Sequence, residues 1–350
     1  STTMKPFKDY FLSILVVTAM SISISSCKED NETPVGEFST GVLVVNEGSF
    51  GASDGSITHY NPDTNEAVQD IFGQKNNDLA LGDIVQSLTI AGDFAYAVVN
   101  NDNKVEVVKA NTFESVNTIS GVSLPRYFTT HNGKGYLTEW VNFTDPGRVA
   151  VINLNSNTVE TTIGTDYGSE NIVVANNKIF VSNNFTNSIS VINPTTNTIS
   201  TTIDVANSPG ELLLDADNKL WVLCGGNYGE DNASLHRINT TTNEVDKVVE
   251  LERSSSKVAI NNARNQLLYV SGNNIYKISI TDTVAPETAF ITVTAAVGLY
   301  GIGIDPATDE IYLADAKGFV ANGSVYRYSA SGTLIDEFAA GKGPNGFVFR

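Results

Sequence analysis

Residues 178–203 read KIFVSNNFTNSISVINPTTNTISTTI and contain one complete structural repeat. The run begins with a short strand pattern around Phe180 and continues, after a polar loop, with an alternating pattern over 188–192. The turn sequence Asn-Pro-Thr-Thr-Asn at 193–197 then leads into a third strand pattern over 198–203. Alternation with a period of two residues, bounded by turn residues, is typical of β-strands in hairpins.

The same unit recurs along the chain. In both directions from Phe180, a large aromatic or aliphatic residue recurs in the first strand of each unit, at intervals of 40 to 53 residues. The seven positions are Leu43, Tyr96, Tyr136, Phe180, Trp221, Tyr269 and Tyr312. A period of this length, with about four short strands per unit, is typical of β-propeller blades. The sequence therefore predicts an all-β, seven-bladed β-propeller over residues 40–350.

The turn also repeats. Asn-x-x-x-Asn segments occupy 61–65, 153–157, 193–197 and 239–243. Asparagine hydrogen-bonds to nearby backbone groups and tolerates left-handed backbone angles, so each segment predicts a tight hairpin.

The ends of the repeat array predict how the ring closes. The first unit lacks an inner strand before 42–45, whereas the chain finishes with an additional strand pattern at 346–350. We expect this C-terminal strand to become the inner strand of blade one, because closure removes exposed strand edges that otherwise favour aggregation.

The N-terminal segment predicts export. A basic stretch at 4–8 precedes an apolar run at 11–24, which is the layout of a signal peptide and shorter than a membrane span of about 20 residues. Ile24-Ser-Ser-Cys27 resembles a lipobox, which implies cleavage before Cys27 and its lipidation. We expect a signal peptide at 1–26, in which residues 1–3 precede the expected start Met4 and are extraneous, and a lipidated tether at 27–39.

The acidic stretch 28–32 resembles the export signal of surface lipoproteins in Bacteroidota, and a solvated tether is the alternative interpretation. The expected location is the outer membrane, lipid-anchored and exposed at the cell surface. The 21 lysines and arginines against 39 aspartates and glutamates give a formal charge of −18, which argues against nucleic-acid binding. Contact with the membrane is expected only through the lipid.

The repeat units resemble the YVTN-type, YncE-like propellers. Three motifs, at 45–50, 81–87 and 124–128, are similar to those of a Bacteroidota branch of DUF5074-like lipoproteins that includes the BtuG-type surface cobalamin-capture proteins. This resemblance implies capture of a bulky nutrient such as cobalamin or another corrinoid, and delivery to a TonB-dependent transporter. It implies the architecture more strongly than the ligand.

In a propeller, the loops between strands two and three and the connections between blades share one face. The sequence places many aromatic and amide side chains there. Rings bury flat apolar surface while amides bond to a polar rim, so such a set suits a corrinoid, a glycan or a protein loop. The candidate ligand-binding residues are Phe50, Gln86, Asn100, Arg126, Tyr127, Trp140, Phe143, Asn184, Phe185, Tyr228, Tyr300 and Phe319.

Enzyme functions are less favoured, and we expect no catalytic residue, metal or cofactor. The three histidines, His59, His131 and His236, are far apart in the sequence and give no zinc-site spacing. A lactonase-like centre would need oxygen ligands in the channel, for which Glu170, Glu211 and Asn345 are candidates. The alternative is that these residues pair with Arg126 and Lys257.

Two further interpretations remain open. The first is a cell-surface scaffold that binds a protein or glycan without a small ligand, and the second, minor one is the metal-dependent lactonase-like hydrolase. A deep, aromatic-lined pocket favours a small molecule, whereas a broad flat face favours a macromolecule. Cys224 is expected to be a small buried apolar residue.

Overall fold

The computed structural model describes residues 36–227 and 231–350. These residues fall within one compact unit, Val35–Arg350. The predicted signal peptide at 1–26, the lipidation site Cys27 and the tether up to residue 35 lie outside the described residues. No helix in the described part of the chain is long and apolar enough to cross a membrane.

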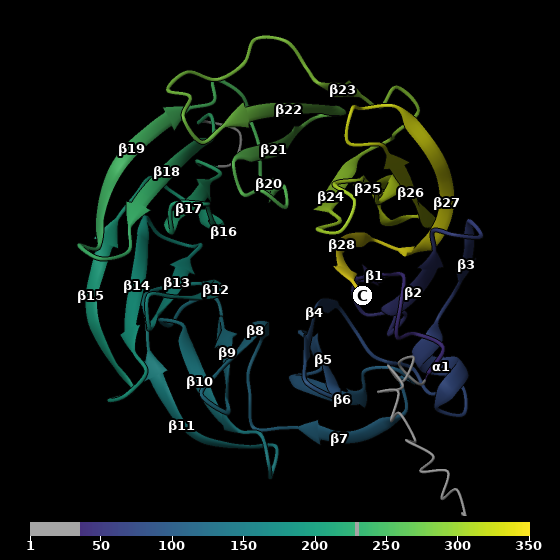
Figure 1. The fold of residues 1–350 in the computed structure, drawn as a ribbon. Coiled ribbons are helices and arrows are strands. Elements are labelled where there is room, and N and C mark those ends of the chain that lie inside the picture. The colour runs from purple at the N-terminus through teal and green to yellow at the C-terminus, as the bar shows by residue number, and fades with distance from the viewer. Residues whose placement is uncertain (1–35, 228–230) are drawn as a thin grey trace, which may run out of the picture. The chain divides into compact units, whose positions relative to one another are not determined.

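The unit consists of seven four-stranded antiparallel sheets arranged in a ring (Figure 1). From the inner to the outer strand, blade one consists of β28 (Pro344–Phe349), β1 (Val42–Asn46), β2 (Ser56–Asn61) and β3 (Glu66–Val68), and blade two of β4 (Val85–Ala91), β5 (Phe94–Val99), β6 (Lys104–Lys109) and β7 (Ser115–Ile119). Blade three consists of β8 (Pro125–His131), β9 (Lys134–Glu139), β10 (Arg148–Asn153) and β11 (Thr158–Gly164), and blade four of β12 (Ser169–Ala175), β13 (Lys178–Asn183), β14 (Ser188–Asn193) and β15 (Thr198–Asp204).

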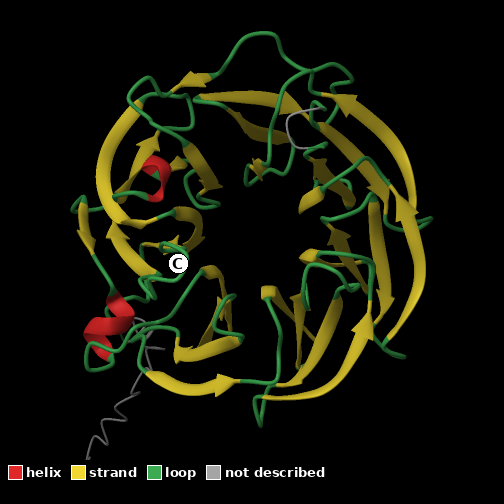
Figure 2. Ribbon diagram, turned by 180° about the vertical axis from the view of Figure 1, so that it is seen from behind, coloured by secondary structure: helices red, strands yellow, loops and turns green. Residues whose placement is uncertain are grey.

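Blades five to seven follow the same order. Blade five consists of β16 (Pro209–Leu214), β17 (Lys219–Cys224), β18 (Ser234–Asn239) and β19 (Glu244–Glu250). Blade six consists of β20 (Lys257–Ile260), β21 (Gln266–Ser271), β22 (Asn274–Ser279) and β23 (Ile291–Thr292), and blade seven of β24 (Leu299–Ile304), β25 (Ile311–Asp315), β26 (Asn322–Tyr328) and β27 (Leu334–Lys342). Two short helices, α1 (Ile71–Lys75) and η1 (Lys317–Phe319), lie in the connections (Figure 2). The predicted seven-bladed propeller is confirmed.

The C-terminal strand closes the ring as predicted. β28 pairs antiparallel with β1, with Val44 opposite Phe347 and Leu43 opposite Val348. Blade one is therefore built from both ends of the propeller sequence, and β1 has a partner on each side.

The repeating large residues hold neighbouring blades together. All seven predicted positions lie on the second strand of a blade and are almost fully buried. Tyr96, for example, stacks on Phe128 of the next blade with ring centroids 4.4 Å apart. Burial of such large rings between sheets is the main stabilising contribution available to a chain without a disulfide among its described residues.

The Asn-x-x-x-Asn segments form the predicted hairpin turns. In the turn at 193–197, the backbone N–H of Thr195 donates to Oδ1 of Asn193, and Asn197 adopts a φ of 54°. The first asparagine thus supplies a hydrogen-bond acceptor and the last one accepts the left-handed conformation.

The end of the predicted tether segment, 27–39, is packed on the propeller. Phe38 is only 2% exposed, and its ring lies edge-on to Phe113 at a centroid distance of 5.9 Å. Its backbone N–H donates to the carbonyl of Asn111. Burial of an aromatic ring thus fixes residues 36–39 to blades one and two, so they are not a free tether.

Candidate functional site

One face of the propeller carries the loops between the second and third strands and the connections from each outer strand to the next inner strand. We call it the loop face. Its intrablade loops differ in length: blade six has the two-residue turn of Gly272 and Asn273, whereas blade five has the loop 225–233. A short loop between longer ones leaves a depression in the face.

A hollow of about 750 Å³ lies at this depression. Small and polar residues of blades four to seven form most of its wall. The lining comprises Asn184, Ser208, Gly210, Leu223, Gly225, Gly226, Asn227, Asp231, Ser254, Ser255, Ser256, Lys257, Val270, Gly272, Asn273, Val297, Gly298 and Leu299. The glycines and serines leave the space unfilled because they have little or no side chain. The volume lies within the range of small-molecule sites.

Three aromatic side chains form a cluster next to the hollow. Trp140 and Phe143 come from the blade-three loop, and Phe185 directly follows the hollow residue Asn184. The centroid of the Trp140 ring is 4.8 Å from that of Phe185 and 5.9 Å from that of Phe143. Phe143 is 73% exposed, so the cluster presents apolar surface on the loop face.

Arg126 and Glu170 hold Trp140 in place. The Trp140 indole N–H donates to Oε2 of Glu170 at 3.1 Å, and Nε of Arg126 donates to Oε1 of the same carboxylate at 2.9 Å. The Arg126 guanidinium also lies 3.6 Å from the Trp140 ring centroid, a cation–π distance. Of the channel residues considered as partners of Arg126 and Lys257, Glu170 thus pairs with Arg126, and this pair fixes the indole.

Two predicted amide ligands instead link neighbouring blades. Nδ2 of Asn100 donates to the carbonyl of Pro125, and Nδ2 of Asn184 donates to the carbonyl of Pro209, both at 3.1 Å. In each case the acceptor is the first residue of the next inner strand. Asn100 is buried, whereas Asn184 keeps part of its surface in the hollow.

Gln86, Tyr127 and Tyr300 lie at the mouth of the central channel. Nε2 of Gln86 donates to the hydroxyl of Tyr127 at 3.2 Å. Burial raises the pKa of Tyr127, and the carboxylates of Glu170 and Glu211 raise it further. The pKa of Tyr300 is raised mainly by burial and further by the neighbouring carboxylate of Glu47. All these phenols are therefore neutral hydrogen-bonding groups at physiological pH.

The remaining predicted residues lie apart from the aromatic cluster. Phe319 contacts Tyr300 edge-on at 5.0 Å, on the blade-seven side of the loop face. Phe50, in the loop of blade one, is 80% exposed. Tyr228 lies outside the described residues. The structure thus brings together Trp140, Phe143 and Phe185, but not all the predicted aromatics.

A smaller cavity of about 180 Å³ occupies the central channel. Its lining includes Gln86, Tyr127, Glu211, Lys257 and Asn345 from five inner strands. Lys257 lines both this cavity and the hollow. This lysine therefore borders both spaces.

The channel residues considered for a cation do not converge as a ligand set. Glu170 is engaged by Arg126 and Trp140, and Nδ2 of Asn345 donates to Glu47 at 2.8 Å. Within 36–227 and 231–350, no three histidine, cysteine, aspartate or glutamate side chains form a group that could hold a metal ion.

Two other potential nucleophiles lack a catalytic setting. The first is Ser53, because Gly51-Ala-Ser-Asp-Gly55 has the Gly-x-Ser-x-Gly spacing of a nucleophile elbow. This segment lies in the loop between β1 and β2 and leads into a strand, whereas a nucleophile elbow leads into a helix. Cys224 is fully buried, as expected, and burial raises the pKa of its thiol to about 12.

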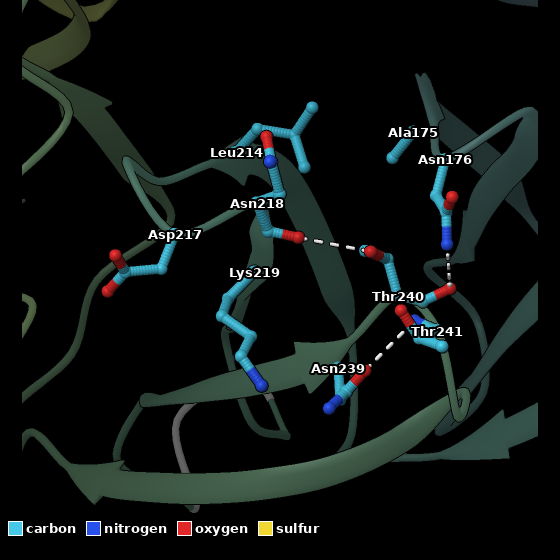
Figure 3. Close-up of a pocket in the computed structure, with 9 residues that line it drawn as sticks. All are labelled: Ala175, Asn176, Leu214, Asp217, Asn218, Lys219, Asn239, Thr240 and Thr241. Carbon is cyan, nitrogen blue, oxygen red and sulfur yellow. Dashed lines mark hydrogen bonds between the residues drawn. The ribbon is translucent and has the colours of Figure 1, made fainter.

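A third pocket, also polar and of about 430 Å³, lies on the opposite face, between blades four and five (Figure 3). Its polar groups are largely satisfied within the protein. Nδ2 of Asn176 donates to the carbonyl of Thr240, and the Thr240 hydroxyl donates to the carbonyl of Asn218. This pocket is a junction of turns that link the two blades.

Most residues that line the hollow were not predicted from the sequence. Much of the wall of the hollow comes from Gly225, Gly226 and the three serines at 254–256. In the sequence these residues indicate only loops. Their significance depends on which loops become neighbours in the ring. Only the blade count combined with loop lengths could have located them.

This geometry defines the class: a closed seven-bladed β-propeller with a ligand-sized hollow on its loop face. Residues 40–349 match the family described as a domain of unknown function, DUF5074, and the chain belongs to that family. A search of curated proteins found no significant sequence match.

Solved structures share the fold at low sequence identity. A quinoprotein alcohol dehydrogenase-like protein from Bacteroides thetaiotaomicron has a TM-score of 0.70 at 15% identity, over 89% of this chain and 78% of that one. A functionally unknown protein from Desulfotomaculum acetoxidans has a TM-score of 0.69 at 11% identity, over 89% and 99%. At these identities the similarity establishes the fold alone.

Proposed function

We propose that this protein is a lipid-anchored capture protein of the outer-membrane surface. It binds a bulky, largely uncharged nutrient, a corrinoid such as cobalamin, and delivers it to a TonB-dependent transporter. The protein contributes binding and carries no catalytic machinery of its own. The lipobox and the resemblance to cobalamin-capture propellers support the location and the transport role.

The observation that carries the proposal is the 750 Å³ hollow on the loop face. Its wall includes the amides of Asn184, Asn227 and Asn273. Each amide donates one hydrogen bond within the protein, and its oxygen and second N–H can bond to the carboxamide periphery of a corrinoid. The neighbouring Trp140, Phe143 and Phe185 rings supply apolar surface for the flat part of such a ligand. The charge of −18 favours a neutral or cationic ligand over an anionic one.

The test is a calorimetric titration of the chain from Asn31 onward, which retains the whole compact unit, with cyanocobalamin and with cobinamide. The proposal expects tight binding, with a Kd in the nanomolar range or below. Absence of heat with either ligand at several temperatures would overturn it.

A second candidate function, docking of a partner protein or an envelope glycan, is favoured by a different observation. Phe50 and Val320, on the loops of blades one and seven, are 80% and 85% exposed. Exposed apolar side chains on one face are a feature of interaction surfaces. In this case Phe50→Ala and Val320→Ser abolish partner binding, whereas corrinoids give no heat with any variant.

A further inference from the structure

The channel cavity contains two opposite charges that do not contact each other. Among the described residues, the Glu211 carboxylate forms no hydrogen bond and no ion pair. The Lys257 ammonium likewise has no carboxylate or carbonyl partner among these residues, and it lies over the Tyr300 ring, with Nζ 4.9 Å from the centroid. Both side chains line the same 180 Å³ space.

The other charged groups around the channel mouth are satisfied. Arg126 pairs with Glu170 at 2.9 Å, and Asn345 donates to Glu47 at 2.8 Å. Glu211 and Lys257 are both half-buried, and charges taken partly out of water are costly unless they are paired and hydrogen-bonded. Consistently, burial raises the pKa of Glu211, against the opposing effect of Lys257. Glu211 and Lys257 are thus the two charged groups of the channel that remain available to bind a ligand.

The channel cavity lies beside the hollow. Lys257 lines both spaces, and Gly210 in the wall of the hollow directly precedes Glu211 in the channel. A ligand seated in the hollow therefore lies beside the entrance to the channel cavity. The cavity is smaller than a typical small-molecule site of about 300–1,000 Å³, so it takes a short arm and not a whole ligand.

The chemistry of the lining selects the arm. Glu211 accepts hydrogen bonds and Lys257 donates them, while the Tyr127 hydroxyl accepts from Gln86 and keeps its proton available. A carboxamide presents a donor and an acceptor together, which matches Glu211 on one side and Lys257 or Tyr127 on the other. A carboxylate would face Glu211 with like charge, near the carboxylates of Glu47 and Glu170.

We infer that the central channel is a subsite for one carboxamide-bearing arm of the ligand, held between Glu211 and Lys257, and that it rejects an arm ending in a carboxylate. This inference rests on the proposed function and deepens it. It makes the channel a specificity-determining part of the site.

The experiment compares cyanocobalamin with its separated monocarboxylic acid derivatives, in each of which one amide arm is hydrolysed. Calorimetric titrations use wild type, Glu211→Gln and Lys257→Met. We expect at least one acid isomer to bind wild type about 10- to 100-fold more weakly than cyanocobalamin, because one hydrogen bond to a charged group is replaced by repulsion. Glu211→Gln should reduce that difference to less than about threefold, since glutamine can donate to the carboxylate.

Lys257→Met should weaken cyanocobalamin binding about tenfold, because the arm loses its charged donor. The matched control is Glu244→Gln, an exposed glutamate on the outer strand β19 of the same blade, which should behave as wild type. Equal binding of cyanocobalamin and all acid isomers to wild type, unchanged in Glu211→Gln, would overturn the inference while leaving the proposed function intact.

A second measurement covers the case in which no corrinoid binds and the proposed function fails. Propionamide alone, at increasing millimolar concentrations, should raise the thermal unfolding temperature of wild type more than propionate does, by linkage of binding to folding. This stabilisation should be lost in Lys257→Met. Equal effects of the two compounds on both proteins would overturn the carboxamide subsite independently of the corrinoid result.

Discussion

The central carbon of the Arg126 guanidinium lies 3.6 Å from the Trp140 ring centroid, and both side chains bind the Glu170 carboxylate. A large ring on a surface loop is thereby held rigid by two charged partners from inner strands. Rigid aromatic side chains lose little conformational entropy on binding, which makes this cluster a good anchor for a ligand.

The exposed member of the cluster offers the cleanest test of its role. Phe143→Ala should leave the free energy of unfolding nearly unchanged, because the ring is 73% exposed. It should weaken corrinoid binding about tenfold, as expected for truncation of a binding hot spot. Isothermal titration measures the effect. Phe94→Ala is the control on the opposite face, and equal effects of both variants would exclude a role for the cluster.

The seam between blades one and seven should depend on Arg327. Its guanidinium makes a bidentate ion pair with Glu310, at 2.8 and 3.0 Å, and donates to the Tyr60 hydroxyl at 3.3 Å. Burial and the hydrogen bond to Asp336 raise the pKa of Tyr60 to about 12, so the phenol stays neutral. Arg327→Ala should lower the free energy of unfolding by about 2–4 kcal/mol, since it strands a largely buried carboxylate.

Urea denaturation measures that loss. The control is Lys109→Ala, which removes an ion pair to Glu114 in which both side chains are more than half exposed. Exposed pairs contribute at most about 1 kcal/mol, so the control should stay close to wild type. A loss in Arg327→Ala no larger than in the control would show that the seam does not depend on this arginine.

Ring closure should be required for solubility. Deletion of residues 344–350 removes β28 and leaves the edge of β1 (Val42–Asn46) without its inner partner. An exposed apolar strand edge pairs with other chains. We expect the deletion variant to form oligomers in sedimentation velocity experiments, whereas the parent sediments as one smaller species. A deletion variant that sediments like the parent would contradict the closure account.

The pH dependence of stability should report on Glu211. Burial raises its pKa in the folded state, so the folded protein binds this proton more tightly than the unfolded chain does. The contribution of Glu211 to the free energy of unfolding is therefore largest below its unfolded pKa of about 4.3, and it decreases as the pH rises through the pKa in the folded state. Glu211→Gln should therefore be more stable than wild type at pH 7, with the difference vanishing at low pH.

Urea titrations at several pH values test this expectation, with Glu244→Gln as the control. A difference between Glu211→Gln and wild type that is constant over the whole pH range would show that the carboxylate carries no burial cost.

The sequence was sufficient for the fold because the repeat is written in local patterns. Second-strand residues such as Trp221 and turn residues such as Asn193 repeat with the blade and keep the same role in each copy. Pairing of the last strand with β1 followed from an incomplete first unit. These features depend on neighbours in the chain or on ring closure alone.

The site was less predictable because its properties arise between blades. Asn100 has the composition of a ligand residue, but its amide is used by the carbonyl of Pro125 in the next blade. The sequence suggested that Glu170, Glu211 and Asn345 pair with Arg126 and Lys257. Arg126 does contact Glu170, whereas Lys257 and Glu211 do not contact each other. The hollow exists because residues such as Gly272 have no side chain to fill it, and no sequence motif indicates where such a space will form.

The central claim is that the hollow on the loop face is the binding site, and blocking it is the most direct test. Ser256 is an exposed residue of its wall, so Ser256→Trp should fill the space without disturbing the core. Cyanocobalamin titrations should show tight binding to wild type and to the opposite-face control Ser156→Trp, and binding at least about 100-fold weaker to Ser256→Trp. Equal affinity for all three proteins, or no binding to any of them, would contradict the claim.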